Sequence, residues 1–84
     1  NKRGIAICGS GIGMSIVVNR HRGVRGALCM DANMAKLSRL HNDSNVLVLG
    51  ARLINKGMAG EIVRVWLETP FEGGRHARRV SQID

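Results

Sequence analysis

A strand, a glycine-rich turn and the start of a helix follow one another in GIAICGSGIGMS, residues 4–15. The apolar run 4–7 is typical of a buried strand, and residues 14–21 have the composition of a short helix. A turn between two such elements directs several backbone N–H groups toward one point, where the helix dipole adds roughly half a positive charge. This stretch therefore predicts an anion-binding loop at the end of a strand.

Cys8 stands at the start of this loop. Backbone N–H groups and a helix N-terminus favour the thiolate form of cysteine, which is its reactive form. A thiolate beside an oxyanion cradle is an arrangement suited to catalysis as well as to binding. Cys8 is therefore a candidate base or nucleophile.

The spacing of the glycines decides against a nucleotide. Residues 9, 11 and 13 form G-x-G-x-G, which matches neither the dinucleotide pattern G-x-G-x-x-G nor the Walker pattern with its Lys-Ser/Thr. We therefore expect no cofactor. The same glycines can also serve only to tighten a strand-to-helix turn, so the loop alone leaves both interpretations open.

Composition is typical of one globular domain, and we treat residues 1–84 as such. The chain has 84 residues, of which 44% are hydrophobic, and its mean hydropathy is -0.04. No apolar run approaches the roughly 20 residues that a membrane-spanning helix needs. We expect a protein of the cytoplasm that is not associated with a membrane.

The net charge of +7 favours an anionic partner. Trp66 and Phe71 are the only aromatic residues, so the stacking platform of single-strand nucleic-acid binders is missing. The basic residues also concentrate in two segments, 20–25 and 75–79, instead of one long stripe. A small phosphorylated substrate therefore fits better than nucleic acid, and a non-catalytic polyanion binder stays as an alternative.

Apolar runs alternate with amphipathic segments along the chain, in the βαβαβ order of a parallel sheet with right-handed crossovers. The fold class is therefore α/β, with a three-layer Rossmann-like sheet. In the second helix we place Met34 and Leu37 on the core side, and we take Trp66 in the third as a packing residue. The expected strands are 4–8, 24–30 and 46–49, and the expected helices are 14–21, 32–40, 56–68 and 75–83.

The two cysteines follow strands that we expect to be neighbours in the sheet. Cys8 and Cys29 form no C-x-x-C pair, and the other candidate ligands lack metal-site spacing, so we expect no metal site. A structural disulfide is not expected either, and Cys29 fits best as a small buried hydrophobic residue.

Ligands of an open parallel sheet gather at the carboxyl ends of its strands. The segments 8–13, 29–31 and 50–52 follow the three expected strands and belong at that edge. The segment His41-Asn42-Asp43 precedes the third strand and therefore belongs at the opposite edge. Its participation in the same site requires a long loop or a neighbouring subunit.

Three segments together resemble the type B ribose-5-phosphate isomerases of the ribose/galactose isomerase family. They are ICGSGIGMS (7–15), LSRLHNDSNVL (37–47) and EGGRHARRV (72–80). The resemblance covers nearly the whole chain in order and spacing. The His-Asn-Asp and Gly-Gly-Arg-His segments are much more specific than the glycine loop.

The resemblance implies an enzyme that interconverts aldose and ketose phosphates through an enediolate, without metal or nucleotide. Cys8 then corresponds to the group that moves the proton, Ser10 to the hydroxyl beside it, and His41 to the residue that assists ring opening. The implied substrate contacts are the loop backbone at Gly9, Gly11, Ile12 and Gly13, the side chain of Asn42, and the phosphate ligands Arg52, Arg75 and Arg79.

The resemblance also implies a larger assembly than this chain. The family has a five-stranded sheet with a further half ahead of this region, so we expect this chain to be the carboxyl-terminal part, with the last three strands. The family's sites are shared between the subunits of a homodimer, which can pair into a dimer of dimers.

The implied substrates are ribose 5-phosphate and ribulose 5-phosphate, sugars of the pentose phosphate pathway. A 6-phosphohexose such as allose or galactose 6-phosphate is the alternative, and the pair His41-Asn42 favours the ribose branch.

Overall fold

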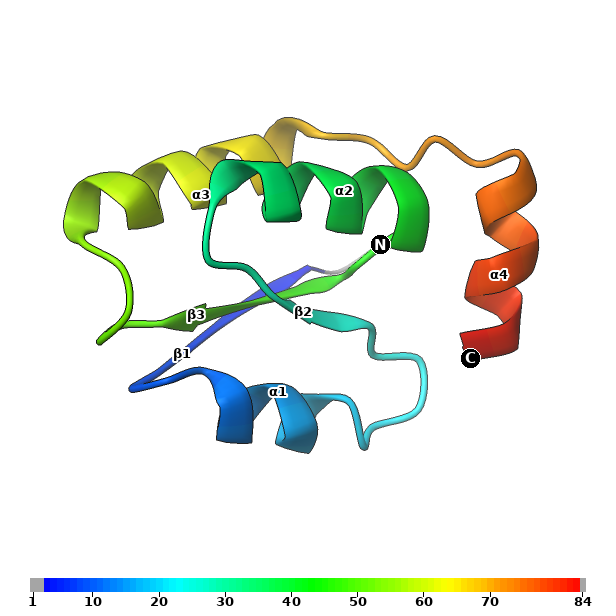
Figure 1. Cartoon of the computed structure of the whole chain (residues 1–84). Helices are drawn as coiled ribbons and strands as arrows, with labels where there is room; N and C mark the ends of the chain where they lie inside the picture. The colour runs from blue at the N-terminus through cyan, green and yellow to red at the C-terminus, as the bar shows by residue number, and fades with distance from the viewer. Residues whose placement is uncertain (1–2, 84) are drawn as a thin grey trace.

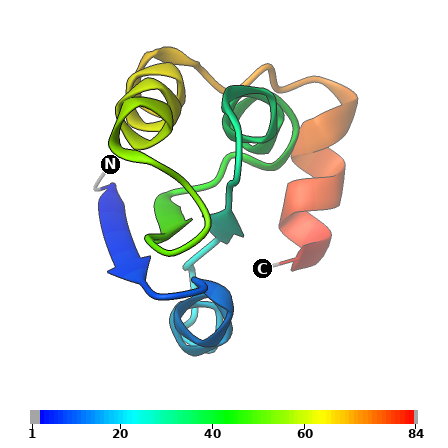
Figure 2. The same cartoon turned by 60° about the vertical axis from the view of Figure 1, so that its left-hand side comes forward.

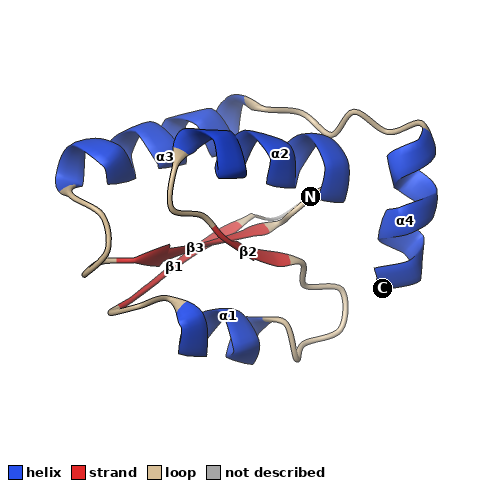
Figure 3. Cartoon of the chain, viewed as in Figure 1, coloured by secondary structure: helices blue, strands red, loops and turns tan. Residues whose placement is uncertain are grey.

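The computed structural model describes residues 3–83, which form three parallel strands and four helices (Figure 1; Figure 3). Helix α1 covers one face of the sheet, α2 and α3 cover the other, and α4 stands beside the end of α2 (Figure 1). The expected three-layer α/β fold is confirmed. No helix within residues 3–83 is long and apolar enough to cross a membrane. The elements are β1 (Gly4–Cys8), α1 (Ile12–Val18), β2 (Gly26–Leu28), α2 (Ala32–Asn42), β3 (Val46–Gly50), α3 (Lys56–Glu68) and α4 (Arg75–Ile83).

The strand order is β1-β3-β2, which corrects one expectation. Strand β1, which ends at Cys8, and strand β2, which precedes Cys29, are not neighbours, because β3 pairs with both and separates them (Figure 2). The connection from β1 to β2 skips one position in the sheet, and the connection from β2 runs back in the opposite direction, so that β3 lies in the skipped position. Since parallel crossovers are right-handed, this reversal of direction places α1 and α2 on opposite faces of the sheet.

The second strand is shorter than the expected 24–30. At its start, asparagine side chains form the hydrogen bonds of two backbone N–H groups. Asn45 Oδ1 accepts from the backbone N–H of Arg25 at 2.7 Å, and Asn19 Oδ1 accepts from that of Gly26 at 2.7 Å. Asn19 also donates to the carbonyl of Ser15 at 2.8 Å, which ends α1 at Val18, three residues earlier than expected.

The core lies between β3 and the pair of helices α2 and α3. Leu47, Leu49, Ile62 and Trp66 are almost completely buried there. The indole Nε1 of Trp66 donates to Ser44 Oγ at 2.8 Å, so the polar end of this large side chain is satisfied inside the core. The expectation that Trp66 is a packing residue is confirmed.

Helix α2 buries a different face from the one its sequence predicts. Met34 and Leu37 are each 40% exposed, whereas Ala35 and Arg39 are buried. Ala35 lets the helix approach its neighbours closely, and Arg39 is buried because acceptors surround its guanidinium group. Arg39 donates to Asp43 Oδ1 at 2.8 Å, to the carbonyl of Ser44 at 2.6 Å and to that of Thr69 at 3.0 Å.

Candidate active site

The Cys8 loop is the segment of residues 8–13, and it is anchored to the chain that follows β3. The backbone N–H of Ala51 donates to the carbonyl of Cys8 at 2.7 Å, and that of Arg52 donates to the carbonyl of Gly9 at 2.9 Å. Because these bonds join the carboxyl ends of two paired strands, the loop lies where ligands of a parallel sheet gather.

Two glycines are required for this close approach. Gly11 has a φ of 80°, and a Cβ there would lie 2.5 Å from the side chain of Leu28. A Cβ on Gly50 would lie 2.5 Å from the carbonyl oxygen of Ser10. Side chains at these positions would push the loop off β3, so the glycines do more than permit a turn.

The loop leads directly into α1. Ser10 Oγ accepts from the backbone N–H of Ile12 at 3.3 Å, and the N–H of Ser15 donates to the carbonyl of Gly11 at 2.9 Å. The N–H groups of a first helical turn have no partner within the helix. Apart from the N–H of Ile12, which donates to Ser10 Oγ, they are potential donors to an anion at the loop.

The two cysteines differ in their surroundings. Cys8 is half-buried at the end of β1, where its free thiol borders the loop. Cys29 is buried, and its Sγ lies 3.7 Å from the carbonyl of Ala27 and 4.0 Å from Ser38 Oγ. Desolvation raises the pKa of the Cys29 thiol, which disfavours its reactive form. Both thiols are free, so Cys8 is the better placed of the two for chemistry.

Arg52 reaches the same loop from the other strand end. Its guanidinium passes so close to Gly9 that a Cβ there would lie 3.2 Å from Nε. The structure thus brings Cys8, Ser10, the loop backbone and Arg52 together, as expected for one edge of the sheet. We call this group the loop half-site.

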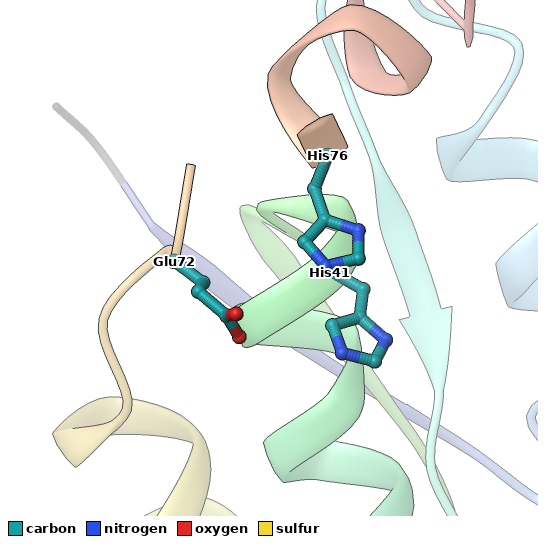
Figure 4. A group of neighbouring side chains, drawn as sticks. All are labelled: His41, Glu72 and His76. Carbon is teal, nitrogen blue, oxygen red and sulfur yellow. The ribbon is translucent and has the colours of Figure 1, made fainter. Parts of the chain in front are cut away.

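A second group gathers at the carboxyl end of α2, beside the start of α4 (Figure 4). The rings of His41 and His76 stack with their centroids 4.2 Å apart and an angle of 17° between their planes. Partial desolvation lowers the pKa of His76, and the neighbouring His41 lowers it further. The other expected residues of this group lie beside them in the chain: Asn42 ends α2, Arg75 begins α4, and Arg79 lies one turn later on α4.

This second group, the histidine half-site, lies far from the loop half-site. Cys8 stands at the carboxyl end of β1, whereas His41 precedes β3 at its amino end, and α4 stands at that same end (Figure 1). One chain therefore does not unite its own Cys8 with its own His41. The sequence-based expectation that the His41 segment lies at the opposite edge is confirmed.

Two residues of the histidine half-site were not predicted from the sequence. Glu72 and His76 lie next to His41 in space, although 31 positions separate His41 from Glu72 in the chain. The i, i+4 relation of Glu72 and His76 is a weak signal by itself. Only the return of the chain from α3 to α4 brings the pair to α2.

The comparisons with known proteins agree with these observations. A model of the ribose/galactose isomerase family matches residues 1–83. The chain belongs to this family. The resemblance seen in the three sequence segments is thereby confirmed.

Individual relatives show the same relation. Ribose-5-phosphate isomerase B of Escherichia coli strain K12 is 48% identical over 80 residues, covering 95% of this chain and 54% of the relative. D-erythrulose-4-phosphate isomerase of Pectobacterium atrosepticum is 46% identical over 83 residues, covering 99% of this chain and 55% of the relative. The chain thus spans about half the length of the curated relatives it matches.

A solved structure extends the agreement to three dimensions. The ribose 5-phosphate isomerase of Thermotoga maritima superposes with a TM-score of 0.97 at 54% identity, over 99% of this chain and 57% of that one. The Rossmann-like fold class follows for this family member, which provides about half of such a structure.

Proposed function

We propose that this chain is the carboxyl-terminal part of an enzyme that interconverts ribose 5-phosphate and ribulose 5-phosphate. The observation that carries the proposal is the free, half-buried thiol of Cys8 beside a loop of backbone donors, in a chain of this family. Proton abstraction next to a carbonyl needs a base and donors directed at the oxygen that gains charge. Cys8 and its loop supply both.

The proposed reaction balances without a cofactor. The Cys8 thiolate takes the proton from C2 of the open-chain aldose, the C–H electrons form the C1=C2 double bond, and the carbonyl oxygen becomes an enediolate. Backbone N–H groups of residues 9–13 stabilise that oxygen, with the Ser10 hydroxyl beside it. The thiol then returns the proton to C1, the hydroxyl proton on O2 passes to O1, and the electrons of the O2–H bond form the C2 ketone.

The histidine half-site of the partner subunit completes the active site in this proposal. His41 transfers protons between the anomeric hydroxyl and the ring oxygen during ring opening, and Asn42 holds a sugar oxygen. Arg75 and Arg79 bind the phosphate, since a guanidinium fork matches its oxygens, and Arg52 adds a third positive charge from the loop half-site. The enzyme is then a homodimer or a dimer of dimers, and we place it in the cytoplasm.

The length of the sugar is the part of the proposal that most needs a test. Two relatives of nearly equal identity have names that specify sugars of different length, ribose 5-phosphate and erythrulose 4-phosphate. The ratio of kcat/KM values for four-, five- and six-carbon phosphates, measured on the complete protein, answers the question. A higher value for allose or galactose 6-phosphate than for ribose 5-phosphate would replace our proposal by the hexose alternative.

The role of Cys8 is tested by deuterium exchange followed by NMR. In the complete protein, Cys8→Ala should abolish both isomerisation and exchange at C2 while the phosphate still binds, because only the proton carrier is lost. Cys29→Ala is the matched control and should keep nearly full activity, since that thiol is buried in the core. Exchange at the wild-type rate in Cys8→Ala would refute the assignment.

A further inference from the structure

Three side chains of the histidine half-site carry metal-binding atoms that converge. His41, Glu72 and His76 each offer one nitrogen or oxygen atom, and these atoms all lie within 4.8 Å of one another (Figure 4). His41 comes from the last turn of α2, Glu72 from the connection before α4, and His76 from the first turn of α4. The cluster therefore joins the end of α2 to the stretch that leads into α4.

The backbone fixes this convergence. The N–H of Glu72 donates to the carbonyl of Leu40 at 3.1 Å, which pins the connection against the end of α2. The N–H of His76 donates to the carbonyl of Gly73 at 3.1 Å, and the His76 side chain is buried against His41 with only 6% of the residue exposed. These contacts bring the two imidazoles together before any ligand binds.

The lone pairs of the three side chains are available. Within residues 3–83 none of the three side chains forms a hydrogen bond or an ion pair with another residue. Burial and the neighbouring His41 lower the pKa of His76, which favours the neutral imidazole that metals require. The positive charges of Arg75 and Arg79 also act on His76 and oppose a cation, and the carboxylate of Glu72 offsets part of that effect.

The donor set selects the kind of ion. Two imidazole nitrogens and one carboxylate oxygen are the protein ligands of many zinc sites that keep a fourth position open. Bond lengths near 2.1 Å place the ligand atoms of a tetrahedral site about 3.4 Å apart. The present atoms must therefore close by at most about 1.4 Å, and the two stacked rings must tilt apart because each nitrogen lone pair lies in its ring plane. Rotation about the side-chain torsions of His41, Glu72 and His76 supplies both movements.

We propose that His41, Glu72 and His76 form a site for a divalent transition-metal ion such as Zn²⁺, which links α4 to α2. A second claim, on inhibition, rests on the proposed function. An ion bound to His41 withdraws that imidazole from ring opening, so Zn²⁺ is a reversible inhibitor of the isomerase and not its cofactor.

Direct binding tests the site without reference to activity. Calorimetric titration of the complete protein with Zn²⁺ should give one ion per chain in this site, and Glu72→Gln and His76→Gln should each weaken its binding by at least about tenfold. The matched control is His21→Gln, because His21 is exposed and belongs to a different loop. If His76→Gln fails to fold, Glu72→Gln at its exposed position decides. Absence of Zn²⁺ binding, or binding that both variants leave unchanged, would overturn the site.

Activity measurements separate the two claims. Zn²⁺ should suppress isomerisation by the complete protein, a chelator should restore it, and Glu72→Gln should need at least about tenfold more Zn²⁺ for the same inhibition. Site-specific binding without inhibition would retain the metal site and overturn the inhibitory claim. An enzyme inactive on every sugar phosphate would refute the proposed function, while the binding data would still decide the site.

Discussion

The arginine side chains of this chain differ in role: a buried one stabilises the fold, and exposed ones are available to a ligand. Arg39 is buried and directs its donors at acceptors inside the fold. Arg75 and Arg79 are exposed and lie four residues apart on α4, so both can face one ligand. A phosphate dianion is suited to such a pair because each guanidinium can donate two parallel hydrogen bonds.

We expect Arg79→Met in the complete protein to raise KM about ten- to hundredfold with little change in kcat. The lost charge-assisted hydrogen bonds are made in the ground state and in the transition state alike. Arg78→Met is the matched control, since it removes the same charge from the adjacent position of α4. Steady-state kinetics on ribose 5-phosphate provides the measurement, and a fall in kcat with unchanged KM would contradict a phosphate role.

At the scale of elements, the end of α2 is the part that positions the proposed ring-opening residue. Asp43 ends this helix with a φ of 48° and pairs with Arg39 at 2.8 Å, while Arg39 also binds the backbone of Ser44 and Thr69. These bonds tie the end of α2 to the beginning of β3 and the end of α3. His41 stands on that turn, so its place depends on a buried network as well as on helix propensity.

Arg39→Met should destabilise the complete protein by about 2 to 3 kcal/mol, because two carbonyls lose their donor and the Asp43 carboxylate loses its shorter pair and keeps the longer one with Arg25. The matched control is Arg64→Met, which removes the exposed pair of Arg64 with Glu68 at 3.1 Å and should change stability by less than about 0.5 kcal/mol. Urea unfolding at constant protein concentration measures both. Equal unfolding midpoints for the two variants would show that the buried network contributes little.

On the scale of the whole molecule, the open edge of the sheet is the prominent feature. No strand within residues 3–83 pairs with the outer side of β1. Its Ile5 and Ile7 are 47% and 62% exposed, and Ile16 and Val17 of the adjoining α1 are more than half exposed. An unpaired edge beside an apolar surface favours association with another chain segment.

We therefore expect the isolated 84-residue chain to associate or aggregate unless the remaining half of the relatives' fold is supplied. Size-exclusion chromatography with light scattering, together with thermal melting, measures this. Ile7→Lys should reduce the association, because a charged residue on an edge strand opposes pairing. A monodisperse wild-type monomer with a sharp cooperative transition would show that the open edge is harmless.

The separation of the two half-sites leads to a second prediction at this scale. Cys8→Ala and His41→Asn should each be inactive, but mixing the two complete proteins after subunit exchange should restore about one quarter of wild-type activity. About half of the dimers are then mixed, and each mixed dimer has one intact site of two. Cys8→Ala mixed with Cys8→Ser is the control that should stay inactive. No recovery despite mixed-dimer formation would refute a shared site.

The sequence by itself determined the number and order of the helices and strands, and the place of the Cys8 loop at the end of the first strand. Helices α3 and α4 begin and end where predicted, since the signals for a helix lie within one segment: Asn55 caps the start of α3, and Pro70 follows its end. Glycine spacing and the position of Cys8 after a strand are equally local. Residues that follow parallel strands meet at one edge of the sheet, which is why segment 50–52 could be placed at the edge that holds the loop. The pairing of β3 with β1, which brings Arg52 to the Cys8 loop, came from the structure.

The tertiary structure alone decided the strand order, the buried face of α2 and the histidine half-site. The direction in which the chain crosses the sheet places β3 at the centre, and no single segment encodes that choice. Ala35 and Arg39 are buried because α3 and the end of the helix provide close packing and acceptors, which the apolar pattern of α2 does not reveal. His41 and His76 meet only because α4 returns to α2, a contact between residues 35 positions apart.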